Sequence, residues 1–199
     1  MLKRVAAGAC ALIVVGCGQG SSATSTASPS PVPVPVSKID SLIVAIGQIP
    51  GGLDSDGGGV TSAAQDKSDP ACPLPGLGNP SALRSARYSG VGNLFVVQEV
   101  AIYPDAASAH AALQPVIDGL NSCKGKAGAP AVDQSTAAEV SWHAQGFSPV
   151  SGETSTTYAA DTRVVNNVVL KVTAGLFDNP QQVAASVADK IAAKVAAAA

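Results

Sequence analysis

The chain has 199 residues, with 12 Lys or Arg, 14 Asp or Glu and 2 His, so its formal net charge is −2 at pH 7. This balance, without any basic run, argues against binding to the phosphate backbone of nucleic acids, so no nucleic-acid partner is expected. The length beyond the first 36 positions suits one domain with a single core.

The first 17 residues have the layout of a bacterial export signal. Two basic residues precede an uncharged apolar run at 5–15, and residues 14–17 read Val-Val-Gly-Cys. This run is shorter than the roughly 20 residues that a membrane-spanning helix needs. The motif resembles the lipobox of bacterial lipoproteins, which implies cleavage before Cys17 and a lipid on its thiol. We therefore expect 1–16 to be a lipoprotein signal peptide. The mature protein should be anchored to the outer face of the cell membrane or cell envelope.

Residues 17–36 have the composition of a tether. The first part is mostly Gly, Ser, Thr and Ala, and residues 31–36 read Pro-Val-Pro-Val-Pro-Val. The first part should be a flexible coil and the second a stiffer polyproline II rod. Neither buries enough apolar surface to offset the entropy lost on ordering. We expect a disordered tether over 17–36 and a folded domain over 37–199.

Two further cysteines, Cys72 and Cys123, remain in the exported domain. In an oxidising compartment such an isolated pair usually forms a disulfide, so one disulfide is expected. The two histidines, His110 and His143, show no ligand spacing to these cysteines. No metal site and no cofactor are therefore expected.

The domain begins with a predicted amphipathic helix over about 38–47, followed by a long irregular segment from 50 to 80. Within that segment, Asp54 to Gly59 has two interpretations, a calcium loop or a solvated loop. The stretch lacks the spaced ligands and closing Glu of an EF-hand, which favours the solvated loop.

Alternation predicts strands at 82–90 and 94–103. In the second strand, the more apolar face should meet the core; it is formed by Val96, Gln98, Val100 and Ile102. Asp105 is the expected cap of a helix that runs to about residue 121.

Strands are also predicted at 140–147, 153–165 and 167–173, the last two joined by a turn around Asn166-Asn167. Asn179-Pro180 opens a final helix with an apolar residue at every fourth position. Strands follow strands without helical crossovers. The fold class is therefore α+β, an antiparallel β-sheet with helices packed on one face and a single disulfide.

Most of residues 38–195 resemble the extracellular C-terminal sensor domain of mycobacterial PknH-type serine/threonine kinases, a module that also occurs alone in exported lipoproteins. The resemblance rests on 96–109 (Val-Val-Gln-Glu-Val-Ala-Ile-Tyr-Pro-Asp-Ala-Ala-Ser-Ala), on Cys-Lys-Gly at 123–125, and on Val-Val-Asn-Asn-Val-Val-Leu-Lys-Val-Thr-Ala at 164–174. That family has a helix-and-sheet fold with a cleft proposed to bind an unidentified ligand, and typically two disulfides. Cys72 and Cys123 match one. The places of the second, near 158–160 and 174–175, hold no cysteine here.

The resemblance implies a membrane-anchored lipoprotein whose non-catalytic, sensor-like domain binds a small molecule, a lipid or an envelope component in a cleft. The alternative is an exported serine-type hydrolase. The chain contains no Gly-x-Ser-x-Gly elbow, but a set of His143, Asp161 and a serine stays open because triads assemble in space. A serine within hydrogen-bond reach of His143 would favour the hydrolase.

If a ligand lies on the sheet surface that helices leave uncovered, the candidates point away from the apolar face of the 94–103 strand or lie on neighbouring strands. They are Phe95, Val97, Glu99, Tyr103, Arg87, Trp142, Tyr158 and Arg163. Their mixture suits a largely apolar ligand with one polar contact. Facing on the neighbouring strands depends on register. The alternatives are a core role for Trp142, and a face that is solvent-exposed or covered by the 50–80 segment.

Overall fold

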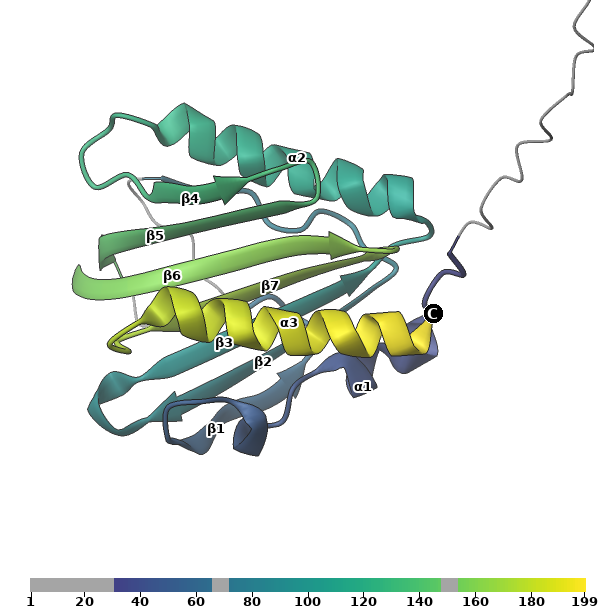
Figure 1. The fold of residues 1–199 in the computed structure, drawn as a ribbon, viewed down its shortest axis with the longest axis horizontal. Coiled ribbons are helices and arrows are strands. Elements are labelled where there is room, and N and C mark those ends of the chain that lie inside the picture. Colours follow the sequence, from purple (N-terminus) through teal and green to yellow (C-terminus); the bar gives the residue numbers. More distant parts are fainter. Residues whose placement is uncertain (1–30, 66–71, 148–153) are drawn as a thin grey trace, which may run out of the picture. The chain divides into compact units, whose positions relative to one another are not determined.

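The computed structural model describes residues 31–65, 72–147 and 154–199; the expected signal peptide, Cys17 and most of the expected tether lie outside these ranges. Seven strands form one antiparallel sheet in the order β1-β2-β3-β7-β6-β5-β4 (Figure 1). The strands are β1 (Leu53–Thr61), β2 (Ala82–Gly90), β3 (Phe95–Ile102), β4 (Ala131–Ser135), β5 (Glu139–Phe147), β6 (Thr154–Val165) and β7 (Val168–Gly175). The helices are α1 (Ile39–Leu42), α2 (Ala106–Cys123) and α3 (Pro180–Ala198), with short 3-10 turns at 36–38, 46–48 and 91–93. None of the described helices is both long and apolar enough to span a membrane.

One face of the sheet packs against α1 and α3. Val100 of β3 lies opposite Leu170 of β7, and both meet Val187 and Ile191 of α3 in the larger core cluster. This is the face that alternation on 94–103 predicted to meet the core, and the prediction is confirmed. The start of α3 is also confirmed, since the Asn179 side chain accepts a hydrogen bond from the Gln182 backbone N at 3.1 Å.

The predicted α+β fold with an antiparallel sheet is confirmed. Helix α2 packs on the opposite face from α1 and α3, so the helices cover both faces rather than the one that was expected. Leu113 and Val116 of α2 pack with Trp142 and Val169 in a second core cluster. All eight residues of β3 are buried, which means that its two faces both need cover. Asp105 caps this helix as predicted, accepting from the Ser108 N at 2.7 Å, and this bond holds the pKa of Asp105 below its usual value.

Neither of the two edge strands was predicted from the sequence. β1 falls in the 50–80 segment, so Asp54 to Gly59 belongs to a strand rather than to a free loop. β4 begins inside the stretch after α2, and its five residues are all exposed. Both strands pair with one neighbour and contain register irregularities. Edge strands with glycines or exposed side chains carry no alternating apolar pattern, which is why the sequence did not indicate them.

The predicted helix over 38–47 is interrupted after Leu42. Ile43 and Ala45 are extended, and Val44 between them is buried. The side-chain amide of Gln98 binds both backbone groups of Val44, the N and the O, at 2.9 Å each. The Tyr88 hydroxyl also donates to the Val44 O at 3.1 Å. These bonds hold the chain in a conformation that a continuous helix cannot adopt.

The ordered domain begins before residue 37, so the expected boundary is placed too late. Val34 is buried in the α3-side core, where its N donates to Oδ1 of Asn167 at 2.7 Å. Nδ2 of Asn167 donates to the O of Val34 at 3.1 Å and to the O of Tyr103 at 2.7 Å. The predicted turn at Asn166 is confirmed, with φ at +56° and Val165 paired to Val168. The end of the Pro-Val repeat is thus part of the fold.

The expected disulfide is confirmed. Cys72 and Cys123 are bonded, with their Cα atoms 5.6 Å apart. Both residues are buried. The bond links the segment before β2 to Cys123, the last residue of α2.

Candidate functional site

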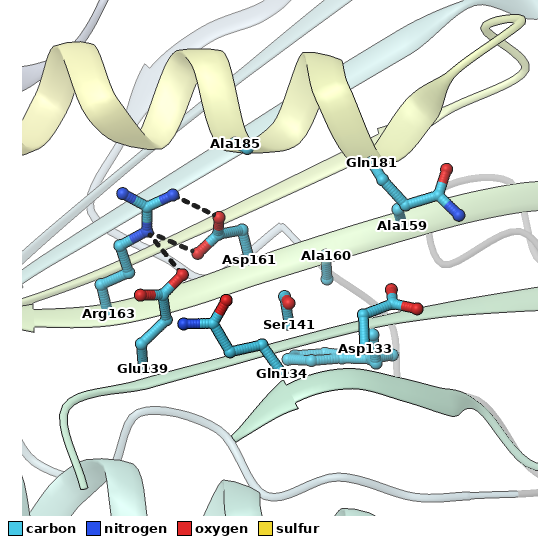
Figure 2. A pocket seen from close by; sticks show the side chains of 11 residues that line it. Asp133, Gln134, Glu139, Ser141, Ala159, Ala160, Asp161, Arg163, Gln181 and Ala185 are labelled. Carbon is cyan, nitrogen blue, oxygen red and sulfur yellow. Dashed lines mark hydrogen bonds and ion pairs between the residues drawn. The ribbon is translucent and has the colours of Figure 1, made fainter. Parts of the chain in front are cut away.

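A pocket of about 430 Å³ lies between α3 and the strands β4, β5 and β6 (Figure 2). Antiparallel pairing places Glu139 opposite Arg163 and Ser141 opposite Asp161, so their side chains share the face that α3 covers in part. The lining residues are Asp133, Gln134, Glu139, Ser141, Trp142, Ala159, Ala160, Asp161, Arg163, Gln181 and Ala185. The pocket therefore combines several carboxylates and amides with a floor of small apolar residues.

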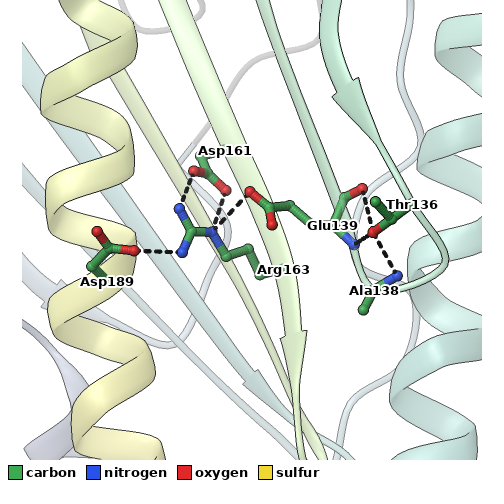
Figure 3. Close-up of polar contacts among 6 residues, drawn as sticks. All are labelled: Thr136, Ala138, Glu139, Asp161, Arg163 and Asp189. Carbon is green, nitrogen blue, oxygen red and sulfur yellow. Dashed lines mark hydrogen bonds and ion pairs between the residues drawn. The ribbon is translucent and has the colours of Figure 1, made fainter.

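Arg163 is the centre of a charged network at one end of this pocket (Figure 3). Its Nε and Nη2 donate to the two carboxylate oxygens of Asp161 at 2.9 and 2.7 Å. Its Nη1 donates to Asp189 of α3 at 2.6 Å, and Oε1 of Glu139 lies 3.3 Å from Nε. Three carboxylates thus surround one guanidinium, which leaves two negative charges in excess.

Burial differs strongly among these four groups. The Asp161 side chain is 4% exposed, whereas Arg163 and Glu139 are 18% and 25% exposed and Asp189 is 68% exposed. The pKa of Arg163 lies above its usual value, mainly because of its hydrogen bonds to Asp161. The hydrogen bond to Asp189 and the negative charge of Glu139 raise it further, whereas burial opposes the rise. The guanidinium is therefore permanently charged, and it neutralises the most buried carboxylate.

A second acid of the pocket, Asp133, pairs with a histidine. Nδ1 of His143 lies 2.8 and 3.0 Å from the two carboxylate oxygens of Asp133. In the described ranges no serine hydroxyl makes a hydrogen bond to His143 or to His110, whose Nδ1 contacts the O of Ala137 at 3.1 Å. Asp161 is bound to Arg163 instead of to His143. The described residues therefore do not assemble the serine, His143 and Asp161 set of the hydrolase alternative.

Two of the eight predicted ligand-binding residues, Trp142 and Arg163, line the pocket. Trp142 is also a buried member of the core cluster under α2. Arg163 lies on the α3 side of the sheet, opposite the surface for which it was proposed. The structure therefore does not bring Arg163 together with the residues of the 94–103 strand.

The other predicted residues lie on the face that α2 covers in part. Phe95, Val97 and Tyr158 form a small buried cluster with Ala144, and Arg87 pairs with Val97 from β2. They are not exposed, because the 50–80 segment crosses this face at two described points.

The first crossing point is Gln65, whose N donates to Oε1 of Glu99 at 2.9 Å. The second is Leu77, whose O accepts the hydroxyl of Tyr103. Burial raises the pKa of Tyr103 to about 12. The sequence left two alternatives for this face, exposure to solvent or cover by the 50–80 segment, and both contacts fit the second.

Sequence reasoning missed Asp133, Glu139 and Asp189 as members of the site. They lie on β4, β5 and α3, and each meets its partner only through the strand register or through helix packing. No local spacing in the sequence links Asp189 to Arg163, which lies 26 positions earlier. The only sequence signal was the alternation of side chains on β5 and β6. It shows which residues share a face only once the pairing register of the two strands is known.

Comparison with known proteins identifies relatives of this domain. A family model described as PknH-like extracellular domain matches residues 34–194. The crystal structure of the extracellular domain of PknH from Mycobacterium tuberculosis is similar with a TM-score of 0.58 and 23% identity, over 80% of this chain and 97% of that one. At this identity the likeness concerns the fold. No curated protein matches the chain.

Proposed function

The chain belongs to the family of PknH-like extracellular domains, and from this premise we propose that it is a lipid-anchored binding protein of the cell envelope whose ligand occupies the pocket beside α3. Membership of an extracellular family implies an exported protein and suggests a sensor-like, non-catalytic domain. The sequence of residues 14–17 supports the lipid anchor.

The charge of the pocket supports a ligand with a positive group. Every guanidinium nitrogen of Arg163 already binds a carboxylate, so the positive charge of the arginine is neutralised and an anion would meet the surrounding carboxylates. The carboxylates of Asp133 and Glu139 also line the cavity. An ammonium group that enters between them would gain charge-assisted hydrogen bonds. This ligand is more polar than the one that the sequence led us to expect.

The shape and the other lining residues favour an organic cation. Alanines at 159, 160 and 185 provide an apolar floor, and Gln134 and Gln181 supply amides. Across the described residues, no group of three His, Cys, Asp or Glu side chains is arranged to hold a metal ion. A small amine with a short aliphatic body fits these surroundings better than a bare ion.

We expect 1,4-diaminobutane to bind the wild-type protein, and Glu139→Gln or Asp133→Asn to weaken this binding about tenfold each, because each removes one charged acceptor. Isothermal titration calorimetry on the full-length protein measures the affinities. Asp118→Asn is the matched control, since Asp118 lies on α2, away from the pocket, and accepts a hydrogen bond from Gln114. Equal binding of 1,4-butanediol, or unchanged affinity in both pocket variants, would contradict the proposed ligand class.

The anchor is tested with Cys17→Ser, which we expect to abolish lipid attachment and the cleavage that accompanies it. The cysteine thiol is the proposed acyl acceptor, and several acyl chains hold a protein on a membrane far better than one. Detergent phase partitioning and intact mass of protein from a bacterial lipoprotein-processing host provide the readout. Cys10→Ser changes the cysteine inside the expected signal peptide and should have no effect. Wild-type protein without added lipid mass would refute the anchor.

A further inference from the structure

Buried polar side chains are concentrated on the sheet face that α2 covers in part. Seven polar or charged residues are buried in the described ranges. Three of them, Gln98, Asp161 and Asn167, make the complete sets of contacts described above. The other four all lie on the α2 face: Ser85, Glu99, Thr162 and Thr173.

Strand register arranges part of this set in a row across the sheet. Ser85 of β2 lies opposite Glu99 of β3, Glu99 opposite Lys171 of β7, and Lys171 opposite Thr162 of β6. On β3 the row lies between Ala101 of the α2 core and Val97 of the small aromatic cluster. Ser85 and Thr162 are three strand spacings apart, which is about 14 Å.

Among the described residues, each end of the row has a buried hydroxyl without a partner, that of Ser85 and that of Thr162, and only the Ser85 end has a second unpartnered group near it. Oγ of Ser85 is buried in a residue that is 0% exposed, and it makes no hydrogen bond to the part of the chain that the structure describes. Two residues further along β2, on the same face, Nε of Arg87 is also buried and unpartnered. Buried polar groups are normally paired because leaving them unpaired lowers stability. Two such groups on the same face of β2, two positions apart, therefore point to a missing acceptor.

The charge at this end supports an anionic acceptor. Among the described arginines, Arg84 pairs with Asp40 and Arg163 with three carboxylates, whereas Arg87 has no ion pair. Glu99 already accepts the N of Gln65, and Lys171 faces it across the strands. Among the described residues of β2, β3 and β7, the charged side chains on this face are Arg87, Glu99 and Lys171, which together carry one positive charge in excess.

We propose that Ser85 and Arg87 form a second ligand site that takes an oxyanion, a carboxylate or a phosphate ester, attached to an apolar body. The hydroxyl of Ser85 and Nε of Arg87 donate to the oxyanion. The apolar body lies against Val97, which pairs with Arg87, and against Phe95. This site is on the opposite face of the sheet from the pocket beside α3, so it does not depend on the function proposed for that pocket.

Octanoate is the probe for this site, and isothermal titration calorimetry with the full-length protein is the measurement. We expect octanoate to bind and 1-octanol to bind at least tenfold more weakly, because octanol lacks the charge. Arg87→Gln should weaken octanoate binding at least tenfold, whereas Arg84→Gln, on the α1 side, should leave the affinity for octanoate unchanged. Absence of octanoate binding, or equal affinity for octanol, would overturn the proposal.

A pair of hydroxyl deletions separates a ligand contact from a structural effect. Ser85→Ala and Thr162→Val each remove a buried unpaired hydroxyl, so both should raise the midpoint of thermal unfolding without ligand. Only Ser85→Ala should weaken the binding of octanoate, because Thr162 lies at the far end of the row. Equal octanoate affinity in wild type and Ser85→Ala would refute the site. Inorganic phosphate that binds as tightly as octanoate would refute the apolar body.

Discussion

Arg163→Met should lower the free energy of unfolding by about 3 kcal/mol. The substitution leaves the Asp161 carboxylate without the two hydrogen bonds that it receives from the guanidinium. Because that side chain is only 4% exposed, water cannot replace the lost partner fully. Removing one member of a buried ion pair typically costs about 3–5 kcal/mol, and the lower end applies since Arg163 is 18% exposed. Urea unfolding at pH 7 measures the change.

Two variants test the cause of this loss. Arg84→Met also removes an arginine from an ion pair, but its partner Asp40 is 70% exposed, so it should cost less than about 1 kcal/mol. Adding Asp161→Ala to Arg163→Met should restore part of the stability, because the unpaired buried charge is then gone. A cost for Arg84→Met as large as for Arg163→Met would show that the buried carboxylate is not the reason.

Loss of the disulfide should be the most destabilising change. Cys72→Ala/Cys123→Ala opens a loop that spans 51 positions, and the chain-entropy model gives a loss of about 4 kcal/mol. Alanine avoids placing new hydroxyls at two buried positions. Thermal and urea unfolding of the double variant and the wild type provide the comparison.

The wild type in reducing agent is the control for this variant. Once its disulfide is reduced in the unfolded state, it should unfold at the same urea concentration as the double variant. Free thiols at both positions in freshly purified exported protein, or a double variant as stable as the oxidised wild type, would contradict the assigned role of the bond.

Elements with local signals were predictable from the sequence. Asp105 and Asn179 predicted the starts of two helices, and the asparagine pair at 166–167 predicted the turn between β6 and β7. The structure contains both helix caps and the turn. β1 and β4 gave no such signal. One contains three consecutive glycines, and the other exposes all its side chains, so their pairing is decided by neighbours rather than by their own pattern.

The candidate site was less predictable because it depends on long-range register. Alternation on the 94–103 strand separated its two faces correctly, and the apolar face meets α3 and α1. The other face resembled an open surface because Glu99 interrupts it. In the structure it is buried, since residues far away in the sequence cross it at Gln65 and Leu77. Arg163 and Glu139 meet only once β5 and β6 are aligned.

The clamp between Asn167 and Val34 determines how tension on the N-terminal segment enters the domain. Both bonds lie on the backbone of a single residue, so a pull on the chain before Val34 loads them together rather than one after the other. The force passes into the turn between β6 and β7, two inner strands of the sheet. There it is shared by the hydrogen-bond ladders on either side, so the edge strands β1 and β4 are not peeled off first. With the tether fixed to a membrane as proposed, mechanical load from the envelope would reach the inner strands of the sheet.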